Sequence, residues 1–413
     1  MPANELENLM TEIVVIGGGP AGLSAALVCA RRGLDTTVIE KRSFPVIKTC
    51  GEGLMPGGVD SLKRLVPQKL INKIEYHPFA GIRYIAPNGE CASGYFGKGD
   101  GWGIERSELS KLLRQAVEQE PGINLLENTV ATVEGSAEQP IVHFNSQTLR
   151  PKLLIAADGL HSPIRRWAEL NGPPSKLKRW GLRQHYQITP WTNLVEVHWS
   201  KDMEAYVTPV SPNTVGIAVL SHRELISSWQ KPISLKATLE VFSNLGPKLL
   251  SSEAKDQLIG IGPLHQTVKR TGTGKVVLVG DAAGYLDAIT GEGVSNAMEQ
   301  ALLIDRIFKK QKEKPSIDEL VFNYANQLPA LMRRYYWLTH LTLLLHRRPS
   351  LVNQVVRVFQ KTPWLFNYLL DINSARSFSE AANSSLQIHG RSYGRELLRV
   401  VTRRSIGEIR KKS

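Results

Sequence analysis

The pattern of apolar and polar residues near the N-terminus predicts a strand, a helix and a second strand. The stretch from Glu12 to Ile16 is apolar enough for a buried strand, and helical periodicity follows from about Ala21 to Arg32. Gly33 is expected to end that helix, and the next apolar run reaches Glu40. A strand, a helix and a strand in so short a segment form a βαβ unit, which begins a parallel sheet.

The middle of the chain has a different pattern, in which short alternating runs are separated by turn residues. Residues 123–158 predict a small meander followed by a core strand, and an Asn-Gly pair predicts a hairpin turn between Ile82 and Phe96. From Leu182 to Leu220, the runs VEVHW, EAYVTPV and TVGIAV predict an antiparallel sheet that faces another part of the molecule on one side. No linker or repeat separates these segments, so two domains are expected to be interleaved along the chain.

Leucines, aromatic residues and basic residues are mixed from Leu331 onward, a pattern typical of amphipathic helices. This segment holds fifteen Lys/Arg and four Asp/Glu, which account for most of the formal net charge of +13. Because the positive charge is confined to one segment, nucleic acid is not expected as a partner. Two interpretations stay open: a helical cap on the core with a solvated basic face, or peripheral association with an anionic membrane surface.

Composition limits the location of the protein and the kinds of site it can hold. With 413 residues, 42% of them hydrophobic, the chain is expected to be globular and soluble, and no apolar run is long enough to span a bilayer. The acidic start MPANELENLM does not resemble a signal peptide. Three scattered cysteines suit neither a disulfide framework nor a zinc site. We therefore expect a cytoplasmic protein without a metal, held at the inner face of the membrane if the C-terminal helices bind lipid.

Gly17, Gly19 and Gly22 have the spacing G-x-G-x-x-G between the first strand and its helix. The first glycine permits a tight turn, the second admits a pyrophosphate against the backbone, and the third lets helix and strand approach closely. The amides at the helix start would then face the phosphates. Glu40, at the end of the second strand, is suited to bind an adenosine ribose. These residues predict a dinucleotide site.

Two further strand ends carry a glycine beside an aspartate. IAADGLHSPIRR places Asp158 and Gly159 after one strand, and VVLVGDAAGYLDAITGEGVSNA places Gly280 and Asp281 after another. In order along the chain, the glycine turn and these two segments resemble the fingerprints of the p-hydroxybenzoate hydroxylase-like FAD-dependent oxidoreductase superfamily. That superfamily includes flavin aromatic hydroxylases, geranylgeranyl reductases and flavin halogenases.

The resemblance implies that the dinucleotide is FAD. It implies that Asp281 binds a ribityl hydroxyl and that a helix beginning near Gly293 points its amides at the pyrimidine edge of the flavin. Arg106 lies where relatives carry an arginine that reaches the FAD phosphates, the alternative being a helix-start residue paired with Glu105 or Glu108. The residues implied to bind FAD are Gly17, Gly19, Gly22, Glu40, Arg42, Arg106, Val130, Asp158, Gly159, Gly280, Asp281, Gly291, Gly293 and Val294.

Four residues are candidates for contact with flavin or substrate. In hydroxylases and geranylgeranyl reductases, the counterpart of KTCGEGLMPGGVDSLKRL passes beside the flavin, which makes Cys50 and Glu52 candidates. A solvent-facing loop with the cysteine packed beneath it is the alternative. On the antiparallel sheet, His185 and Tyr206 are candidates for the pocket wall, although such residues more often belong to the core.

These segments together predict an α/β protein in which a Rossmann-like FAD-binding domain and an antiparallel-sheet substrate domain are interleaved, with helices at the C-terminus. The FAD-binding domain is expected to comprise residues 1–75, 100–165 and 262–330. The substrate domain is expected to comprise residues 76–99 and 166–261, and the basic amphipathic helical region residues 331–413.

Two reactions are compatible with the motifs. GDAAGYLDAITGEG resembles the version in geranylgeranyl reductases, but their aromatic-x-Trp-x-Phe-Pro strand is replaced by AYVTPVSPNTVGIAV, and GEGLMPGGVDSLKRL is close to a hydroxylase pattern. We favour a monooxygenase that uses NADH or NADPH as a transient reductant and hydroxylates a lipophilic phenolic or quinol-like substrate. The alternative is a geranylgeranyl reductase-like enzyme acting on isoprenoid double bonds. The second alternative is a non-catalytic flavin-binding protein at the membrane surface.

Overall fold

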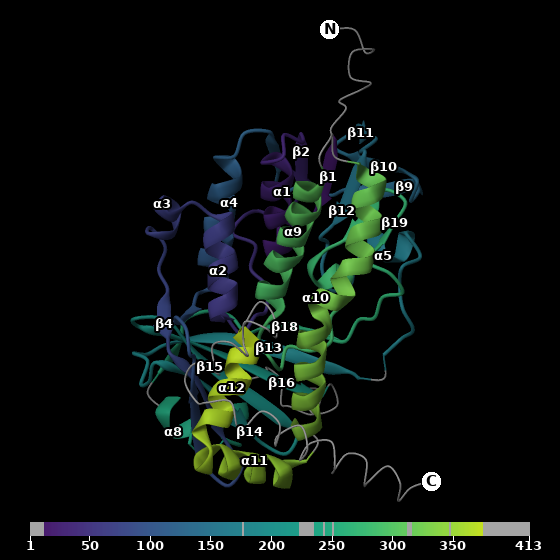
Figure 1. The fold of residues 1–413 in the computed structure, drawn as a ribbon. Helices are drawn as coiled ribbons and strands as arrows, with labels where there is room; N and C mark the ends of the chain where they lie inside the picture. Colours follow the sequence, from purple (N-terminus) through teal and green to yellow (C-terminus); the bar gives the residue numbers. More distant parts are fainter. Residues whose placement is uncertain are drawn as a thin grey trace, which may run out of the picture.

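Two large sheets and a group of C-terminal helices form the described part of the chain (Figure 1). The structure is a computed structural model that describes residues 12–175, 177–222, 235–242, 244–249, 252–311, 316–346 and 348–374. Within these residues the predicted fold class, an α/β protein with an antiparallel sheet and C-terminal helices, is confirmed.

The predicted βαβ unit lies inside a six-stranded sheet of order β19-β20-β12-β1-β2-β8. The pairs from β20 to β8 are parallel, and β19 is antiparallel to β20. Every residue of β1, β2 and β12 is buried, as expected for parallel strands covered on both faces. The bounds are β1 Ile13–Ile16, β2 Thr36–Ile39, β8 Ile123–Leu126, β12 Leu153–Ala156, β19 Gly272–Thr273 and β20 Val276–Leu278.

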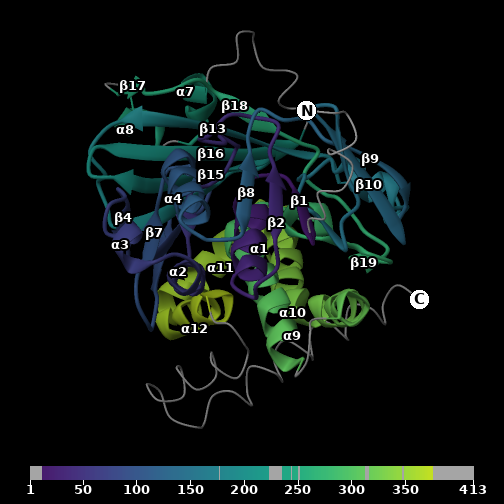
Figure 2. The same cartoon turned by 90° about the horizontal axis from the view of Figure 1, so that it is seen from above.

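Helices pack beside this sheet and beside one another. α1 contacts α9 and α4, and α2 contacts α9 (Figures 1 and 2). α1, α2 and α5 each begin with a proline, which suits the first helical turn because its missing N–H would have no partner there. The bounds are α1 Pro20–Ala30, α2 Pro56–Leu65, α3 Gln68–Ile71, α4 Arg106–Glu118, α5 Pro163–Trp167, the 3₁₀ helix η1 Gly280–Ala283 and α9 Gly293–Lys310.

The prediction for residues 123–158 is partly wrong. β8 pairs with β2 in the six-stranded sheet, because α4 provides a crossover that returns the chain to it, and so β8 is not part of a meander. The meander consists of β9 Thr132–Ser136, β10 Gln139–Phe144 and β11 Gln147–Leu149. A short apolar run does not reveal from its own sequence which sheet it joins.

The second large sheet has the order β17-β13-β16-β15-β14-β5-β6, with β18 also paired to β13. Its strands are antiparallel except for the parallel pair β14 and β5, and β5 and β6 form the predicted hairpin, in which Gly89 has φ +83°. One face packs on α7 (Leu235–Leu239) and the segment around α8 (Gly246–Leu249). The bounds are β5 Gly81–Ile85, β6 Cys91–Tyr95, β13 Arg179–Gln187, β14 Leu194–Trp199, β15 Met203–Ser211, β16 Thr214–His222, β17 Glu253–Ala254 and β18 Ile259–Ile261.

A small antiparallel sheet and three helices complete the described structure. The small sheet contains β3 Gly53–Leu54, β7 Gly101–Gly103 and β4 His77–Phe79. The helices are α10 Ile317–His346, α11 Pro349–Lys361 and α12 Pro363–Ser374. α10 passes α9 and extends toward the antiparallel sheet, where α11 and α12 contact β6 (Figure 1).

The C-terminal helices share the main hydrophobic core, to which Leu343, Val356, Phe359 and Phe366 contribute. This packing agrees with the cap interpretation for the described helices, while residues 375–413 of the predicted basic region lie outside the described residues. None of the helices in the described ranges has the length and apolarity that a membrane span requires. The domain boundaries stay a prediction.

Candidate functional site

The three glycines between β1 and α1 have different surroundings. Gly17 has φ +112°, and a Cβ on it would lie 2.3 Å from the Ala157 carbonyl oxygen. A Cβ on Gly22 would lie 1.8 Å from the carbonyl oxygen of Gly17. Gly19 instead faces open space, with the Arg106 guanidinium 4.0 Å from the position of a Cβ. Gly17 and Gly22 therefore permit the turn, and Gly19 leaves room for a ligand.

Glu40 closes one side of this turn. Its carboxylate accepts hydrogen bonds from the backbone N–H groups of Gly18, at 2.6 Å, and Arg42, at 2.9 Å. The backbone N–H of Thr129 donates to the Glu40 carbonyl at 2.9 Å, which brings the neighbouring Val130 to the same region. The structure thus gathers Glu40, Arg42 and Val130, three of the predicted cofactor residues, beside the glycine turn.

Arg106 is the first residue of α4 and lies at the cavity with its guanidinium buried. Nε and Nη1 have no hydrogen-bond partner among the described residues, and burial lowers the pKa of the guanidinium. The alternative of an ion pair with Glu105 or Glu108 is not what the structure shows, since these carboxylates pair with Lys255 and Lys111. A buried cation with free N–H groups beside Gly19 suits a phosphate.

The carboxyl ends of β12 and β20 bring the other two motifs together, because the strands are parallel neighbours. Asp158 Oδ2 accepts from the Ile164 backbone N–H at 3.1 Å, and Oδ1 has no partner among the described residues. Asp281 lines the cavity, where its Oδ2 accepts from Lys48 Nζ at 2.6 Å. Lys48 was missed in the sequence, where no spacing or motif distinguishes it from other lysines.

The start of α9 lies at the same cavity. Gly291, Gly293 and Val294 line it, and no atom lies within 4 Å of the position of a Cβ on Gly291. The N-cap residue Glu292 makes no side-chain cap hydrogen bond. Burial raises the pKa of Glu292 to about 7, although Arg334 opposes the shift. The start of α9 therefore lies at the cavity without a side-chain cap, so its first backbone amides can serve a ligand there.

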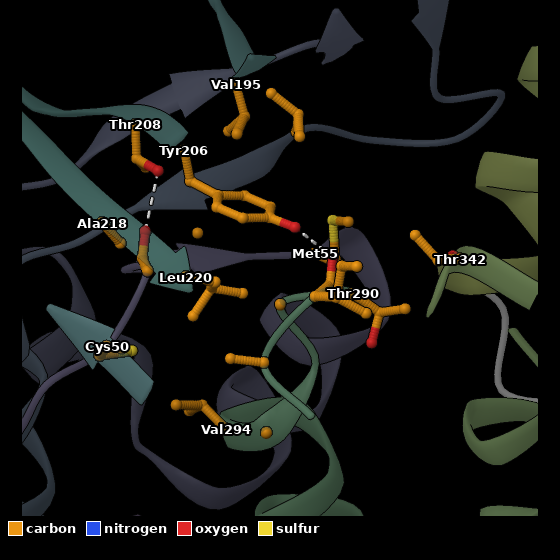
Figure 3. A pocket seen from close by; sticks show the side chains of 18 of the residues that line it. Cys50, Met55, Val195, Tyr206, Thr208, Ala218, Leu220, Thr290, Val294 and Thr342 are labelled. Carbon is orange, nitrogen blue, oxygen red and sulfur yellow. Dashed lines mark hydrogen bonds between the residues drawn. The ribbon is translucent and has the colours of Figure 1, made fainter. Parts of the chain in front are cut away.

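The cavity has a volume of about 580 Å³ and extends from the glycine turn to the C-terminal helices. Figure 3 shows Val195, Tyr206 and Thr208 on the sheet side and Thr342 on the helix side. The Tyr206 hydroxyl donates to the Ile289 carbonyl at 2.8 Å, and Thr208 Oγ1 donates to the Gly51 carbonyl at 2.8 Å. Further lining comes from Leu338, Leu341, Leu345, Val355, Phe359, Phe366 and Leu370.

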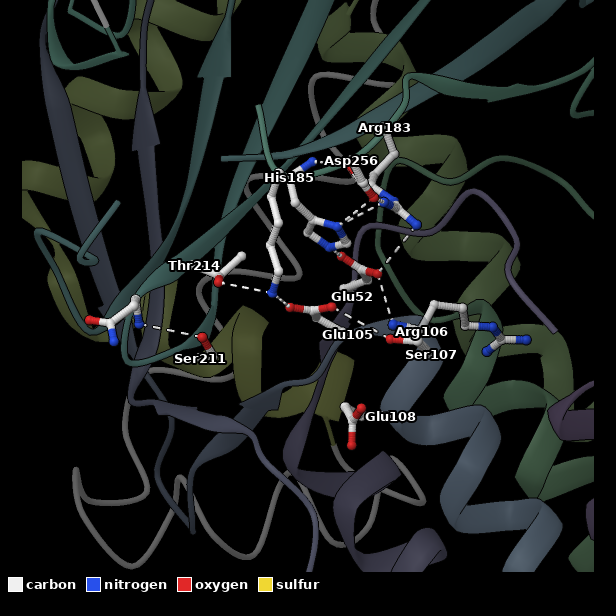
Figure 4. A network of polar contacts seen from close by, with 12 residues as sticks. Glu52, Glu105, Arg106, Ser107, Glu108, Arg183, His185, Ser211, Thr214 and Asp256 are labelled. Carbon is white, nitrogen blue, oxygen red and sulfur yellow. Dashed lines mark hydrogen bonds and ion pairs between the residues drawn. The ribbon is translucent and has the colours of Figure 1, made fainter. Parts of the chain in front are cut away.

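The four candidate contact residues divide into two groups. Cys50 and Tyr206 line the cavity, and burial raises the pKa of each side chain. Glu52 and His185 do not line the cavity, and they contact each other: His185 Nε2 is 2.6 Å from Glu52 Oε2 (Figure 4). His185 also contacts Asp256, a residue that the sequence gave no reason to choose.

The residues in this cavity fit FAD. Gly19 leaves room beside the turn, Arg106 offers unpartnered N–H groups there, and the uncapped start of α9 lines the same cavity. Lys48 adds a second cation. Within the described ranges, no group of three or more His, Cys, Asp or Glu side chains is placed to hold a metal ion.

Known proteins with similar sequences or folds include lipid reductases and a flavoprotein. Digeranylgeranylglycerophospholipid reductase 1 of Methanothermobacter thermautotrophicus is 26% identical over 320 residues, covering 72% of this chain and 76% of its own. Menaquinone reductase of Mycobacterium tuberculosis is 25% identical over 376 residues, covering 84% of this chain and 90% of its own. The crystal structure of a flavoprotein/dehydrogenase from Cytophaga hutchinsonii has a TM-score of 0.75 at 16% identity, covering 97% of this chain and 100% of its own.

The family model described as FAD binding domain matches residues 10–311. Since that match spans most of the chain, the protein belongs to the FAD binding domain family and is an FAD-dependent oxidoreductase.

Proposed function

We propose that the protein reduces carbon–carbon double bonds in the isoprenoid chains of a membrane lipid. The cavity carries this proposal, because it extends from the glycines before α9 to the C-terminal helices and its walls are mostly apolar. The hydroxyl groups of Tyr206, Thr208 and Thr290 are already hydrogen-bonded within the protein. Such walls suit a long hydrocarbon chain, which requires exclusion of water and no polar partner.

The names of two relatives support the same substrate class. One is named as a reductase of digeranylgeranylglycerophospholipid and the other as a reductase of menaquinone. Both compounds are isoprenoid lipids, so a long apolar cavity in this chain agrees with both names.

Reduction of an isolated double bond adds one hydride and one proton to its two carbons. Bound FAD in its fully reduced form, FADH2, would supply both the hydride and the proton, and NADH or NADPH together with a proton from solution is the proposed source that reduces it again. The apolar walls align the chain and exclude water, and the amides at the start of α9 stabilise negative charge at that end of the cavity.

Hydroxylation of a phenolic or quinol-like substrate, which the motifs favoured, stays a prediction. It requires a group that stabilises the phenolate-like form of the ring. In the described part of the chain, three charged side chains line the cavity: Lys48, Arg106 and Asp281. Arg106 and Asp281 are residues predicted to bind FAD, and Lys48 lies beside Asp281. Lys48 and Asp281 already pair with each other. No further cation among the described lining residues is therefore available to a phenolate, which is one reason to propose double-bond reduction.

The cavity also reaches the molecular surface at the C-terminal helices. Leu341 on α10 and Val358 on α11 line it and are 41% and 48% exposed. We propose that the lipid chain enters between these helices from a membrane on which the protein rests. Exposed apolar side chains at a cavity mouth are typical of proteins that take lipids from a bilayer surface.

The test is a product analysis of the FAD-loaded protein with a geranylgeranyl lipid in detergent micelles. We expect the lipid to gain two hydrogens per double bond when NADPH, NADH or dithionite reduces the enzyme, with and without oxygen. A product that carries an added oxygen atom and forms in air alone would establish hydroxylation. Absence of either product together with no oxidation of NADH or NADPH would contradict both enzyme proposals for these lipids.

A further inference from the structure

Glu52, Arg183, His185 and Asp256 form a network of charged side chains (Figure 4). His185 lies between two carboxylates: its Nε2 is 2.6 Å from Glu52 Oε2, and its Nδ1 is 2.8 Å from Asp256 Oδ2. Arg183 also pairs with Asp256. Glu52, His185 and Arg183 are fully enclosed, whereas the Asp256 side chain is 35% exposed.

The network is close to electrically neutral when His185 is protonated, with two cations and two carboxylates. Burial acts to lower the pKa of His185, but hydrogen bonds to Asp256 and Glu52 outweigh it and raise the pKa to about 9. Arg183 Nη1 also lies 2.8 Å from Nδ1, but Nδ1 cannot accept a hydrogen bond while it donates to Asp256. The nearby Lys255 directs its side chain to Glu105.

Glu52 joins the network to the cavity wall. Its φ of +60° lies in the left-handed region, which a non-glycine residue adopts only when its surroundings hold it there. Its backbone N–H donates to Cys50 Sγ at 3.3 Å, and its carbonyl accepts from Ile104 at 2.9 Å. Thr208 fixes the intervening Gly51 through its carbonyl. Cys50 and Gly51, which this backbone positions, line the cavity.

The same carboxylate fixes the start of α4. Glu52 Oε1 accepts from the Arg106 backbone N–H at 2.8 Å, so it caps a helix whose own N-cap residue makes no side-chain cap bond. A carboxylate at a helix N-terminus is favourable because it meets free N–H groups and the positive end of the helix dipole. The residue held in this way carries the unpartnered guanidinium at the cavity.

We infer that Glu52, His185 and Asp256 are positioning residues for FAD. Glu52 holds Cys50 and Gly51 at the cavity and fixes Arg106 beside Gly19, His185 holds Glu52, and Asp256 holds His185. The inference requires that FAD binds in this cavity, and it is independent of which substrate the enzyme uses.

The test compares Glu52→Gln and His185→Gln in the full chain with His198→Gln. His198 is a matched control because it is a buried histidine of the same sheet, 3.2 Å from the Glu196 carboxylate, and does not line the cavity. We expect the first two variants to weaken FAD binding about tenfold, which is the size of effect that loss of a supporting hydrogen bond has at metal sites, and to alter the visible flavin spectrum. His198→Gln should destabilise the fold but keep the wild-type FAD Kd and spectrum.

Two outcomes would overturn the inference. One is wild-type FAD affinity and spectrum in Glu52→Gln and His185→Gln, and the other is an equal loss of affinity in His198→Gln. If Glu52→Gln does not fold, Asp256→Asn replaces it, because Asp256 is at the exposed end of the network and its substitution should affect folding less. A wild-type FAD Kd in Asp256→Asn would then contradict the inference.

The pH dependence gives an independent measurement. Because the folded-state pKa of His185 is raised, the part of the free energy of unfolding that its protonation contributes is fully present below the ordinary value of 6.5 and is lost as the pH rises through about 9. Loss of that proton also removes the positive charge and one of the two N–H donors between Glu52 and Asp256, so the hold on Glu52 weakens and the FAD Kd of the wild type should increase as the pH passes about 9. His185→Gln should lack that step, while any step caused by Cys50 or lysines stays in both proteins. Identical pH profiles would overturn the role of His185.

Discussion

At the scale of single residues, the glycines of the predicted cofactor site are of two kinds. Some are required by the backbone conformation, and one is required only if a ligand lies beside it. Gly22 packs against the carbonyl oxygen of Gly17, so a side chain there would collide with main-chain atoms. Gly19 has an extended backbone, φ −77° and ψ 179°, that any residue adopts, and space beside it. The fold therefore does not require a glycine at position 19, and the predicted FAD pyrophosphate is the reason we propose for it.

This difference predicts opposite results for Gly22→Ala and Gly19→Ala. Gly22→Ala should lower the free energy of unfolding of the FAD-free protein by about 2–4 kcal/mol, because a rigid backbone contact must shift. Gly19→Ala should change it by less than about 0.5 kcal/mol but weaken FAD binding about tenfold. Denaturant unfolding and FAD titration of the two variants measure these effects. Wild-type FAD affinity in Gly19→Ala would show that no ligand passes this residue.

The sequence revealed the site residues that have fixed spacing from a strand end. Gly17 follows β1, Gly22 lies in the first turn of α1 and Asp281 follows β20, where local pattern and spacing identify them. Lys48 and Asp256 act through single side chains that meet partners more than 70 residues away, as shown by the pairs with Asp281 and His185. Nothing local distinguishes such residues, because their role depends on how separate segments pack.

At the scale of elements, β16 shows how one strand serves two environments. Ile217 and Val219 face the second core, with α7 on that side, whereas Ala218 and Leu220 line the cavity. The alternation follows from the two-residue period of a strand. The sequence predicted an antiparallel sheet here that faces another part of the molecule. The opposite wall of the cavity comes from helices that are remote in the chain. That wall could not be predicted, because the strand pattern holds no information about which helices pack against it.

A phenylalanine at neighbouring positions of β16 should distinguish the two faces. Val219→Phe overfills a packed core and should lower the free energy of unfolding by about 1–3 kcal/mol. Ala218→Phe projects into the cavity and should cost less than about 1 kcal/mol, while kcat/KM for a geranylgeranyl lipid falls about tenfold because the chain loses space. Thermal unfolding and product formation check both statements. Equal destabilisation by the two substitutions would contradict an open cavity beside Ala218.

At the scale of the whole molecule, three remote parts of the chain enclose the cavity: the strand ends of the six-stranded sheet, the antiparallel sheet and the C-terminal helices. The helices belong to the main core, so they are part of the fold and also form the mouth of the cavity. Trp337, Leu341 and Leu344 are exposed and lie on one face of α10, spaced by four and three residues. Leu341 of this apolar stripe also lines the cavity, which supports the proposed contact with a lipid surface.

The stripe predicts that charge on it will release the protein from membranes. The double substitution Trp337→Glu, Leu344→Glu should reduce partitioning to vesicles rich in phosphatidylglycerol about tenfold or more, since it removes apolar burial and adds repulsion. Phe322→Glu is the matched control, because Phe322 is also exposed on α10 but lies about four turns before Trp337. Vesicle flotation at low and high salt measures the partitioning, and a chain ending at Ser374 shows what the last basic residues add. If all these proteins float equally, or none of them does, the lipid does not enter from a membrane held against α10, and the mouth serves a substrate delivered in another way.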